Sequence, residues 1–166
     1  RHELATRICE YVAGRVPVVI SVGAESLVAA KSCARQAEAV GVAAVMAIPP
    51  IATLCPESEL ERYYKGLLEA VSIPVIVQDA SGYVGRPMSI ELQASLFHEY
   101  GSRVMFKPEA HPLGPRLTQL RDATDNRAAI FEGSGGIALL DSHARGIEGT
   151  MPGCDLLQIV GPLYRA

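Results

Sequence analysis

Lys107 is one of three lysines in the 166-residue chain, and it ends a predicted strand over residues 103–107. The proline that follows disfavours helical backbone at Lys107. An ammonium group is costly to desolvate where a strand leaves a core, and this cost favours the neutral amine. A neutral lysine amine attacks carbonyl carbon and forms a Schiff base. The residues therefore predict a nucleophilic lysine, and the alternative is a strand-end lysine ion-paired with Glu109 or another carboxylate.

Length and composition favour a single globular α/β domain. About half of the residues are hydrophobic, a fifth are charged, and tryptophan is absent. The net charge of −3 provides no basic face for nucleic acid and no polybasic patch for a membrane surface. No apolar run approaches the ~20 residues that span a bilayer. We therefore expect a small-molecule protein with neither a nucleic-acid nor a membrane partner.

The four cysteines are widely separated, and none has a cysteine or histidine neighbour at metal-ligand spacing. This pattern favours free thiols in a reducing compartment over a disulfide set. We expect a cytoplasmic protein with no metal.

Apolar runs and amphipathic segments alternate along the chain. We expect strands at residues 16–22, 43–48, 74–79, 103–107, 128–132 and 147–150. We expect helices at residues 1–13, 26–40, 56–71, 89–100, 115–124, 137–145 and 155–164. The first strand is a continuous apolar run, which predicts a parallel strand covered on both faces. Strict alternation predicts a parallel sheet with right-handed crossovers, either open and doubly wound or most of an eight-stranded barrel.

A glycine-rich turn, Gly133–Gly136, follows the fifth predicted strand. A turn of this kind before a helix can hold a phosphate group. The segment lacks both the spacing of a dinucleotide fingerprint and a P-loop lysine, so a tight strand-to-helix turn is the favoured interpretation.

The strand ends, taken in order, resemble the dihydrodipicolinate synthase / N-acetylneuraminate lyase family of class I aldolases, over essentially the whole chain. The matching segments are Val22-Gly23-Ala24, Ile48-Pro49-Pro50, Pro74–Asp79, Phe106–Glu109 and Gly146–Gly153. Lys107 occupies the family's Schiff-base position. The resemblance implies a (β/α)8 TIM barrel, in which chemistry lies at the C-terminal ends of the strands.

The resemblance also implies that residues 1–166 form a single partial barrel domain with strands three to eight. The first two strands and the family's C-terminal helical extension would be lacking, and with them a Gly-Thr-Thr/Ser-Gly-Glu turn that holds the substrate carboxylate. Such a barrel would expose strand edges and apolar interior surface, which favours association. Family members are commonly tetramers, so we expect a homo-oligomer.

Three departures from the family pattern concern groups that exchange protons or bind the substrate. Gln78 stands where the family has a catalytic tyrosine; an amide can bind a substrate oxygen but cannot exchange a proton. Asp79, next to it, could act as a base if it points inward, and strand alternation places these two side chains on opposite faces. Ile51-Ala52 replace a tyrosine pair, and Tyr83 replaces an arginine that binds the aldehyde substrate of lysine-pathway synthases. The segments around Gln78 and Lys107 look closer to members that dehydrate or cleave 2-keto-3-deoxy sugar acids.

The resemblance implies a Schiff-base lyase, an aldolase or dehydratase, acting on a pyruvate-like 2-oxo acid or 2-keto-3-deoxy sugar acid through an imine on Lys107. No metal or organic cofactor is expected. Besides Lys107, the resemblance implies a catalytic role for Gln78. It implies substrate binding by Tyr83, Gly133, Ser134 and Met151. One alternative is a catalytically silent relative that binds a sugar acid or serves in assembly; another is a truncated chain that does not fold alone.

Overall fold

Strands and helices alternate along the described residues, 2–52 and 54–165, of the computed structural model. The strands are β1 (Val19–Ser21), β2 (Ala44–Ala47), β3 (Val75–Asp79), β4 (Val104–Pro108), β5 (Phe131–Glu132) and β6 (Gly149–Thr150). The α-helices are α1 (His2–Val12), α2 (Leu27–Ala39), α3 (Glu57–Ala70), α4 (Ile90–Tyr100), α5 (Leu113–Ala123), α6 (Leu139–Ala144) and α7 (Leu157–Arg165). Short 3₁₀ turns precede β4 (Gly101–Arg103) and α7 (Cys154–Leu156). The expected alternation is confirmed; Arg1, with which the first predicted helix starts, lies outside the described residues.

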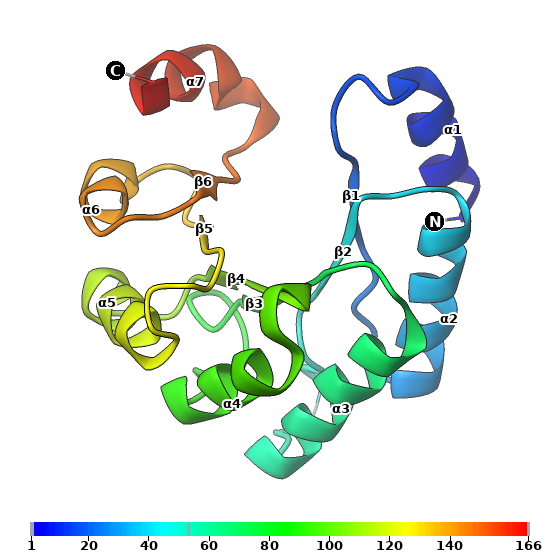
Figure 1. Ribbon diagram of the computed structural model, residues 1–166, viewed down its shortest axis with the longest axis horizontal. Helices are drawn as coiled ribbons and strands as arrows, with labels where there is room; N and C mark the ends of the chain where they lie inside the picture. The colour runs from blue at the N-terminus through cyan, green and yellow to red at the C-terminus, as the bar shows by residue number, and fades with distance from the viewer. Residues whose placement is uncertain (1, 53, 166) are drawn as a thin grey trace.

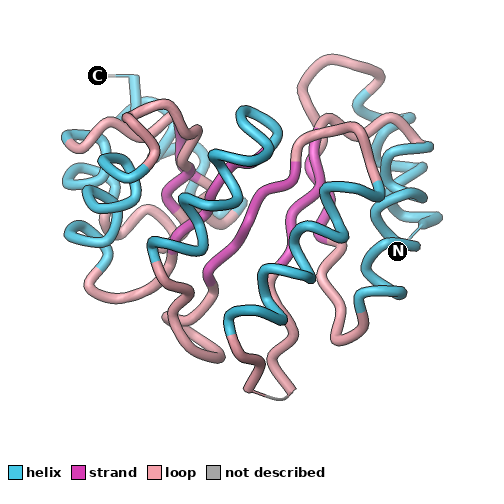
Figure 2. Tube along the Cα trace, turned by 60° about the horizontal axis from the view of Figure 1, so that its bottom comes forward, coloured by secondary structure: helices cyan, strands magenta, loops and turns pink. Residues whose placement is uncertain are grey.

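The strands are parallel and follow each other in space in chain order. Strands β1 to β4 form one sheet, β5 and β6 a second, and a parallel bridge between Phe106 and Ile130 joins the two. Figure 1 shows the result as a crescent, with strands on the inner side and helices outside. Figure 2 shows the helices covering the outer face of the strands. Of the two arrangements that alternation leaves open, this is the barrel-like one: with the strands in chain order, right-handed crossovers place every helix on the same side of a curving sheet.

The core lies between the strands and the outer helices. The side chains with essentially no exposure include Val77 and Phe106 from strands and Leu67, Leu96 and Leu117 from helices. Alternate residues of each strand therefore face the helices, and the residues between them face the inside of the crescent.

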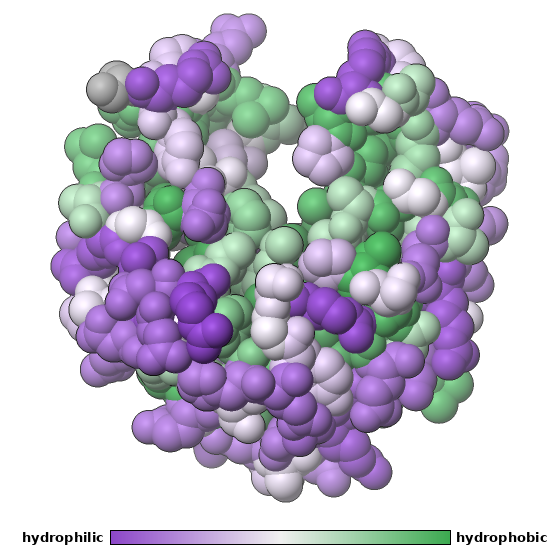
Figure 3. All heavy atoms as spheres, viewed as in Figure 1, coloured by the Kyte–Doolittle hydropathy of each residue, from purple (hydrophilic) through white to green (hydrophobic). Residues whose placement is uncertain are grey.

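The expectation that the first strand is covered on both faces is wrong. In β1, Val19 and Ser21 are exposed, and Ile20 is half-buried. The physical reason is position: β1 is the edge strand of its sheet and bonds β2 alone. Apolar side chains are also exposed on the other arm of the crescent, as Ile159 and Leu163 of α7 are. Figure 3 shows an open hollow between the two arms, with hydrophobic residues along its walls.

The helix starts follow from local chemistry. Helix α3 begins after Pro56 and carries Glu57 and Glu59 in its first turn, where the helix dipole favours acidic groups. Ser89 caps α4 by accepting a hydrogen bond from the Leu92 amide, and Glu57 in turn accepts bonds from the amide and hydroxyl of Ser89. Ser26 occupies the cap position of α2, but its side chain makes no cap hydrogen bond.

The environment of Tyr64 in α3 leads us to expect that the folded state loses stability at alkaline pH. Tyr64 is fully buried, donates to the Ala47 carbonyl at 3.0 Å, and burial raises its pKa well above the ordinary value. The unfolded chain therefore ionises first, so the stability that Tyr64 contributes is present below pH ~10 and is lost as pH rises above it. We expect the difference in free energy of unfolding between the parent protein and Tyr64→Phe to fall at pH above ~10. Urea titrations at neutral and alkaline pH measure it, and a difference independent of pH would contradict the assignment.

Candidate active site

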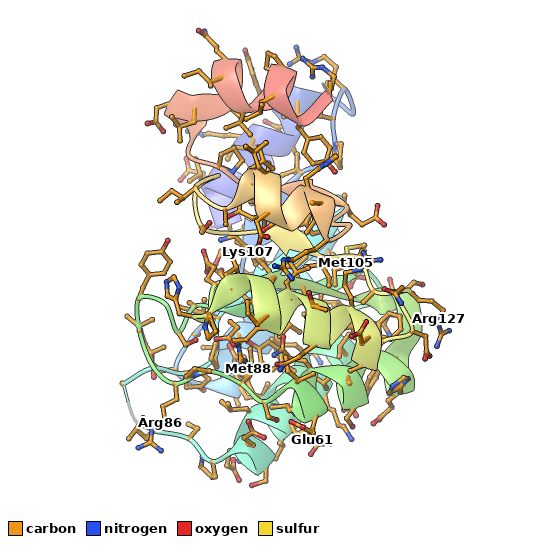
Figure 4. All side chains as sticks on the ribbon, turned by 90° about the vertical axis from the view of Figure 1, so that its left-hand side faces the viewer. Glu61, Arg86, Met88, Met105, Lys107 and Arg127 are labelled. Carbon is orange, nitrogen blue, oxygen red and sulfur yellow. The ribbon has the colours of Figure 1, made fainter. Side chains whose placement is uncertain are left out.

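Strand β4 places Lys107 at its C-terminal end, on the inner face of the crescent. Lys107 is paired in register with Gln78 of β3, so the two side chains share a face. Only 8 % of Lys107 is exposed, and Nζ donates to Glu109 Oε1 at 3.0 Å. Figure 4 shows Lys107 near Met105, two residues earlier on the same strand. The ion pair with Glu109, expected as the alternative to a nucleophile, therefore exists. Lys107 is also buried, as we expect of a nucleophilic lysine.

Glu109 is a candidate functional group to which the sequence interpretation gave no role in the chemistry. It is buried, it lies two residues beyond Lys107 and so on the same face, and both carboxylate oxygens are bound. Oε1 accepts from Lys107, and Oε2 accepts from Gln78 Nε2 at 2.7 Å. The backbone amide of Glu109 bonds the carbonyl of Asp79 at 2.9 Å. The signal in the sequence was the Lys-Pro-Glu spacing, which keeps two side chains on one face of an extended segment.

Asp79 faces the helices, on the opposite side of β3 from Gln78; the opposite orientation is what alternation predicted. Asp79 is buried and accepts hydrogen bonds from the amides of Ser81 and Met88, each at 3.2 Å. The Arg116 guanidinium of α5 lies 3.5 Å from the same carboxylate. These contacts close the loop between β3 and α4 and give Asp79 a structural role, outside the inner face where Lys107 lies.

Gly133 packs directly against the Lys107–Glu109 pair. A Cβ atom at this position would lie 2.7 Å from Glu109 Cγ and 2.9 Å from Lys107 Cγ, closer than real Cβ contacts allow. The glycine at the end of β5 therefore lets a neighbouring strand approach the pair. This position supports the expected site role of Gly133 without testing its contact with a substrate.

Gly133→Ala is expected to displace the lysine or the glutamate. Overpacking of this kind costs ~1–3 kcal/mol of stability, and the displaced Lys107 should form its pyruvate adduct more slowly. Gly161→Ala in α7 is the control, because the nearest atom to its added Cβ is 3.7 Å away. Urea midpoints and rates of adduct formation measure both variants; an unaltered rate in Gly133→Ala would contradict the close packing.

The glycine-rich turn holds an internal carboxylate, so the tight-turn interpretation is confirmed and a phosphate cradle is not formed. Glu132, fully buried, accepts bonds from the amides of Ser134 and Gly136, from the Ser134 hydroxyl, and from Thr150 Oγ1 at 2.7 Å. Gly135 and Gly136 adopt φ of 72° and 88°, a region that favours glycine. The anion that such a turn attracts is supplied by the chain itself.

The three other residues expected to bind a substrate are Ser134, Met151 and Tyr83. Ser134 uses its hydroxyl on Glu132, as above. Met151 follows β6, is half-buried, and bonds the Glu132 carbonyl through its amide at 2.9 Å. Tyr83 lies on the loop after β3 and is 69 % exposed. Their contacts with a substrate stay predictions.

Other charged and nucleophilic side chains lie away from Lys107. Lys65 of α3 sits on the outer surface, where hydrogen bonds to Glu99 and Glu61 raise its pKa. Arg86, on the loop before α4, lies far from Lys107 in Figure 4. All four cysteines are free thiols, as expected. Within residues 2–52 and 54–165, no three His, Cys, Asp or Glu side chains gather to hold a metal, and no helix has the length and apolarity to cross a bilayer.

The site therefore combines a buried lysine, a carboxylate on its nitrogen, and an amide that donates to the carboxylate. A lysine of this kind can add to a carbonyl group, and the carboxylate can accept and return a proton beside it. Gln78, Lys107, Glu109 and Gly133 come together from three adjacent strand ends, which is where such barrels place their chemistry.

Comparison with known proteins identifies the family of the chain. The profile of the family described as the dihydrodipicolinate synthetase family matches residues 1–164. L-2-keto-3-deoxyarabonate dehydratase of Azospirillum brasilense is 33% identical over 171 residues, which cover 100% of this chain and 55% of that enzyme. A 4-hydroxy-tetrahydrodipicolinate synthase of Chloroherpeton thalassium is 25% identical over 76% of this chain and 41% of that protein.

Solved structures show the same fold. A Pseudomonas aeruginosa protein, provisionally described as a dihydrodipicolinate synthetase, superposes with a TM-score of 0.91 at 27% identity, over 99% of this chain and 57% of that one. A sialic acid aldolase of Ruminococcus gnavus, solved as a variant of its catalytic lysine, superposes with a TM-score of 0.87 at 20% identity. The match covers 99% of this chain and 52% of that one. The chain spans about half the length of the relatives it matches. Its strands are part of a (β/α)8 barrel, and the chain belongs to the dihydrodipicolinate synthetase family.

Proposed function

We propose that the protein is a Schiff-base lyase that removes water from a 2-keto-3-deoxy sugar acid through an imine on Lys107. The observation that carries the proposal is the Glu109 carboxylate 3.0 Å from the Lys107 nitrogen. A carboxylate in this place can free the amine for attack and can then carry a proton between two atoms of the substrate.

The first step is imine formation. Glu109 takes a proton from the Lys107 ammonium, and the neutral amine attacks the C2 carbonyl carbon of the substrate. Glu109 returns the proton to the resulting C2 hydroxyl, which leaves as water. The product is a protonated imine on Lys107, and the carboxylate is again ionised beside it. No cofactor is needed for this step, because the protonated imine itself accepts electrons from the neighbouring carbon.

The second step is elimination. Glu109 removes a proton from C3. The electrons of the broken C3–H bond form a C2–C3 double bond, and the imine becomes an enamine. The same proton then passes from Glu109 to the C4 hydroxyl, which leaves as water while a C3–C4 double bond forms and the imine is restored. Hydrolysis of the imine releases the unsaturated product and regenerates Lys107. One carboxylate thus serves as base and as acid.

Two findings favour dehydration over the other lyase reactions of the family. Gln78 stands at the position where a proton-exchanging tyrosine was expected, so the proton must be carried by another group, and Glu109 is the carboxylate present. The dehydratase of Azospirillum brasilense, 33% identical over this whole chain, acts on a 2-keto-3-deoxy acid by name. Because the chain spans 55% of that enzyme, the substrate of the whole protein is part of the proposal.

The test uses the full-length protein with pyruvate and borohydride, followed by intact and peptide mass spectrometry. We expect one reduced pyruvate adduct, on the peptide that contains Lys107. Assays of a panel of 2-keto-3-deoxy sugar acids should then show loss of substrate with release of a dehydrated product. A protein that forms no adduct on Lys107 would sink the proposal.

A catalytically silent relative is the second candidate, and the amide at Gln78 favours it. In that case the adduct with pyruvate forms, but no sugar acid is dehydrated or cleaved. The family resemblance also predicts a tetramer, and the cysteine pattern a cytoplasmic protein; sedimentation velocity of the full-length protein tests the assembly.

A further inference from the structure

We propose that Gln78 is a positioning residue that acts through Glu109, by holding one carboxylate oxygen so that the other exchanges protons at Lys107. The inference rests on the proposed function, in which Glu109 carries the proton. It assigns to Gln78 a task other than proton transfer or substrate binding.

Each carboxylate oxygen of Glu109 is bound by a side chain from a different strand. Oε2 accepts the Gln78 amide of β3 at 2.7 Å, and Oε1 faces the Lys107 nitrogen of β4 at 3.0 Å. A carboxylate can exchange a proton through either oxygen. With Oε2 bound to a donor that cannot release its proton, Oε1 becomes the exchanging oxygen, on the side where the imine forms.

Packing leaves Gln78 as the group that sets the rotation of the carboxylate. The backbone of Glu109 is bound to the Asp79 carbonyl, and Gly133 is packed against its Cγ and Cδ. These contacts restrict the stem, whereas the plane of the carboxylate turns about its last bond, which is a broad torsion. During turnover the Lys107 nitrogen is bonded to the substrate and keeps at most one N–H in the protonated imine, so its hold on Oε1 changes from step to step. The Gln78 amide remains in place throughout.

The experiment is a double-mutant cycle on the full-length protein with Gln78→Met, Glu109→Gln and the two combined. Methionine approximates the size of glutamine and removes the donor. We expect Gln78→Met to lower kcat by about tenfold or more while KM changes by less than about threefold. We expect the combined variant to match Glu109→Gln alone, because Gln78 then has no acid–base group to position. The pyruvate adduct should form in all variants.

Gln93→Met is the matched control. Gln93 of α4 is buried, and its amide donates to the carbonyls of Met88 and Ser89, at 3.3 and 3.2 Å. The substitution removes a comparable buried donor on an outer helix, with no contact to Glu109 or Lys107 among its hydrogen bonds, so it should lower the urea midpoint and leave kcat unchanged. If Gln78→Met does not fold, Gln78→Asn withdraws the amide from Oε2 by one methylene and serves in the same cycle.

The outcomes separate the inference from the function on which it rests. The inference alone is overturned if the losses of kcat in the two single variants multiply in the combined variant. It is also overturned if Gln78→Met raises KM and retains kcat. Either result means that Gln78 binds the substrate itself. A parent protein without a Lys107 adduct overturns the proposed function and the inference together. A loss of kcat that disappears in the Glu109→Gln background, with Gln93→Met active, supports the positioning role.

Discussion

Lys107→Arg is expected to abolish the pyruvate adduct and to lower turnover by at least about 10³-fold. Arginine retains the positive charge and the capacity to bond Glu109, but a guanidinium stays protonated and does not form an imine. The substitution therefore removes the nucleophile while preserving the ion pair that is buried in the resting site. Borohydride trapping and a steady-state assay measure the two effects.

The controls for Lys107→Arg address charge and folding. Lys65→Arg makes the same exchange on the outer face of α3, where the lysine pairs with Glu61 and Glu99. It should leave both trapping and turnover unchanged. A circular dichroism spectrum and urea midpoint near the parent values show that Lys107→Arg is folded. An adduct that persists in Lys107→Arg would place the Schiff base on another amine and defeat the assignment.

Glu109→Gln is expected to separate imine formation from turnover. Glutamine keeps the shape of the side chain and can still bond Lys107, but it cannot carry a proton. General acid–base catalysis contributes roughly 10²–10⁴-fold, so kcat should fall by an amount in that range. The adduct with pyruvate should still form, more slowly, because trapping at long times requires the nucleophile alone. Rapid-mixing trapping and product assays measure the two quantities on the same sample.

Glu148→Gln is the comparison for Glu109→Gln, since Glu148 is exposed and its side chain takes no part in the proposed steps. Stability must be followed as well, because removal of one partner of a buried ion pair typically costs ~3–5 kcal/mol. Loss of the adduct together with the fold would assign Glu109 to structure. Full turnover in a folded Glu109→Gln protein would exclude it as the proton carrier.

The order of the fold could be predicted because it depends on local information. Apolar runs and amphipathic segments recur at the periods of strands and helices, and Pro56, Ser89 and the glycines punctuate them where helices begin and end. The opposite orientation of Gln78 and Asp79 likewise follows from the period of a strand. The exposure of β1 could not be predicted in this way, because an apolar run looks the same in a central strand and in an edge strand.

The sequence alone predicts the nucleophile, because a lysine between a strand and a proline, in the register of a Schiff-base family, is a local pattern. The residues around it were decided by the tertiary structure. Glu109 acquires its role from the 3.0 and 2.7 Å contacts to Lys107 and Gln78, and Gly133 from the approach of β5. Glu132 fills the turn that could otherwise have held a phosphate. The Lys107–Glu109 pair and the contacts of Glu132 with its own turn join residues two to four apart in the chain. The Gln78–Glu109 contact joins residues 31 apart, on different strands, and the approach of Gly133 likewise comes from a neighbouring strand. These two relations depend on how the strands lie beside each other, which no single segment encodes.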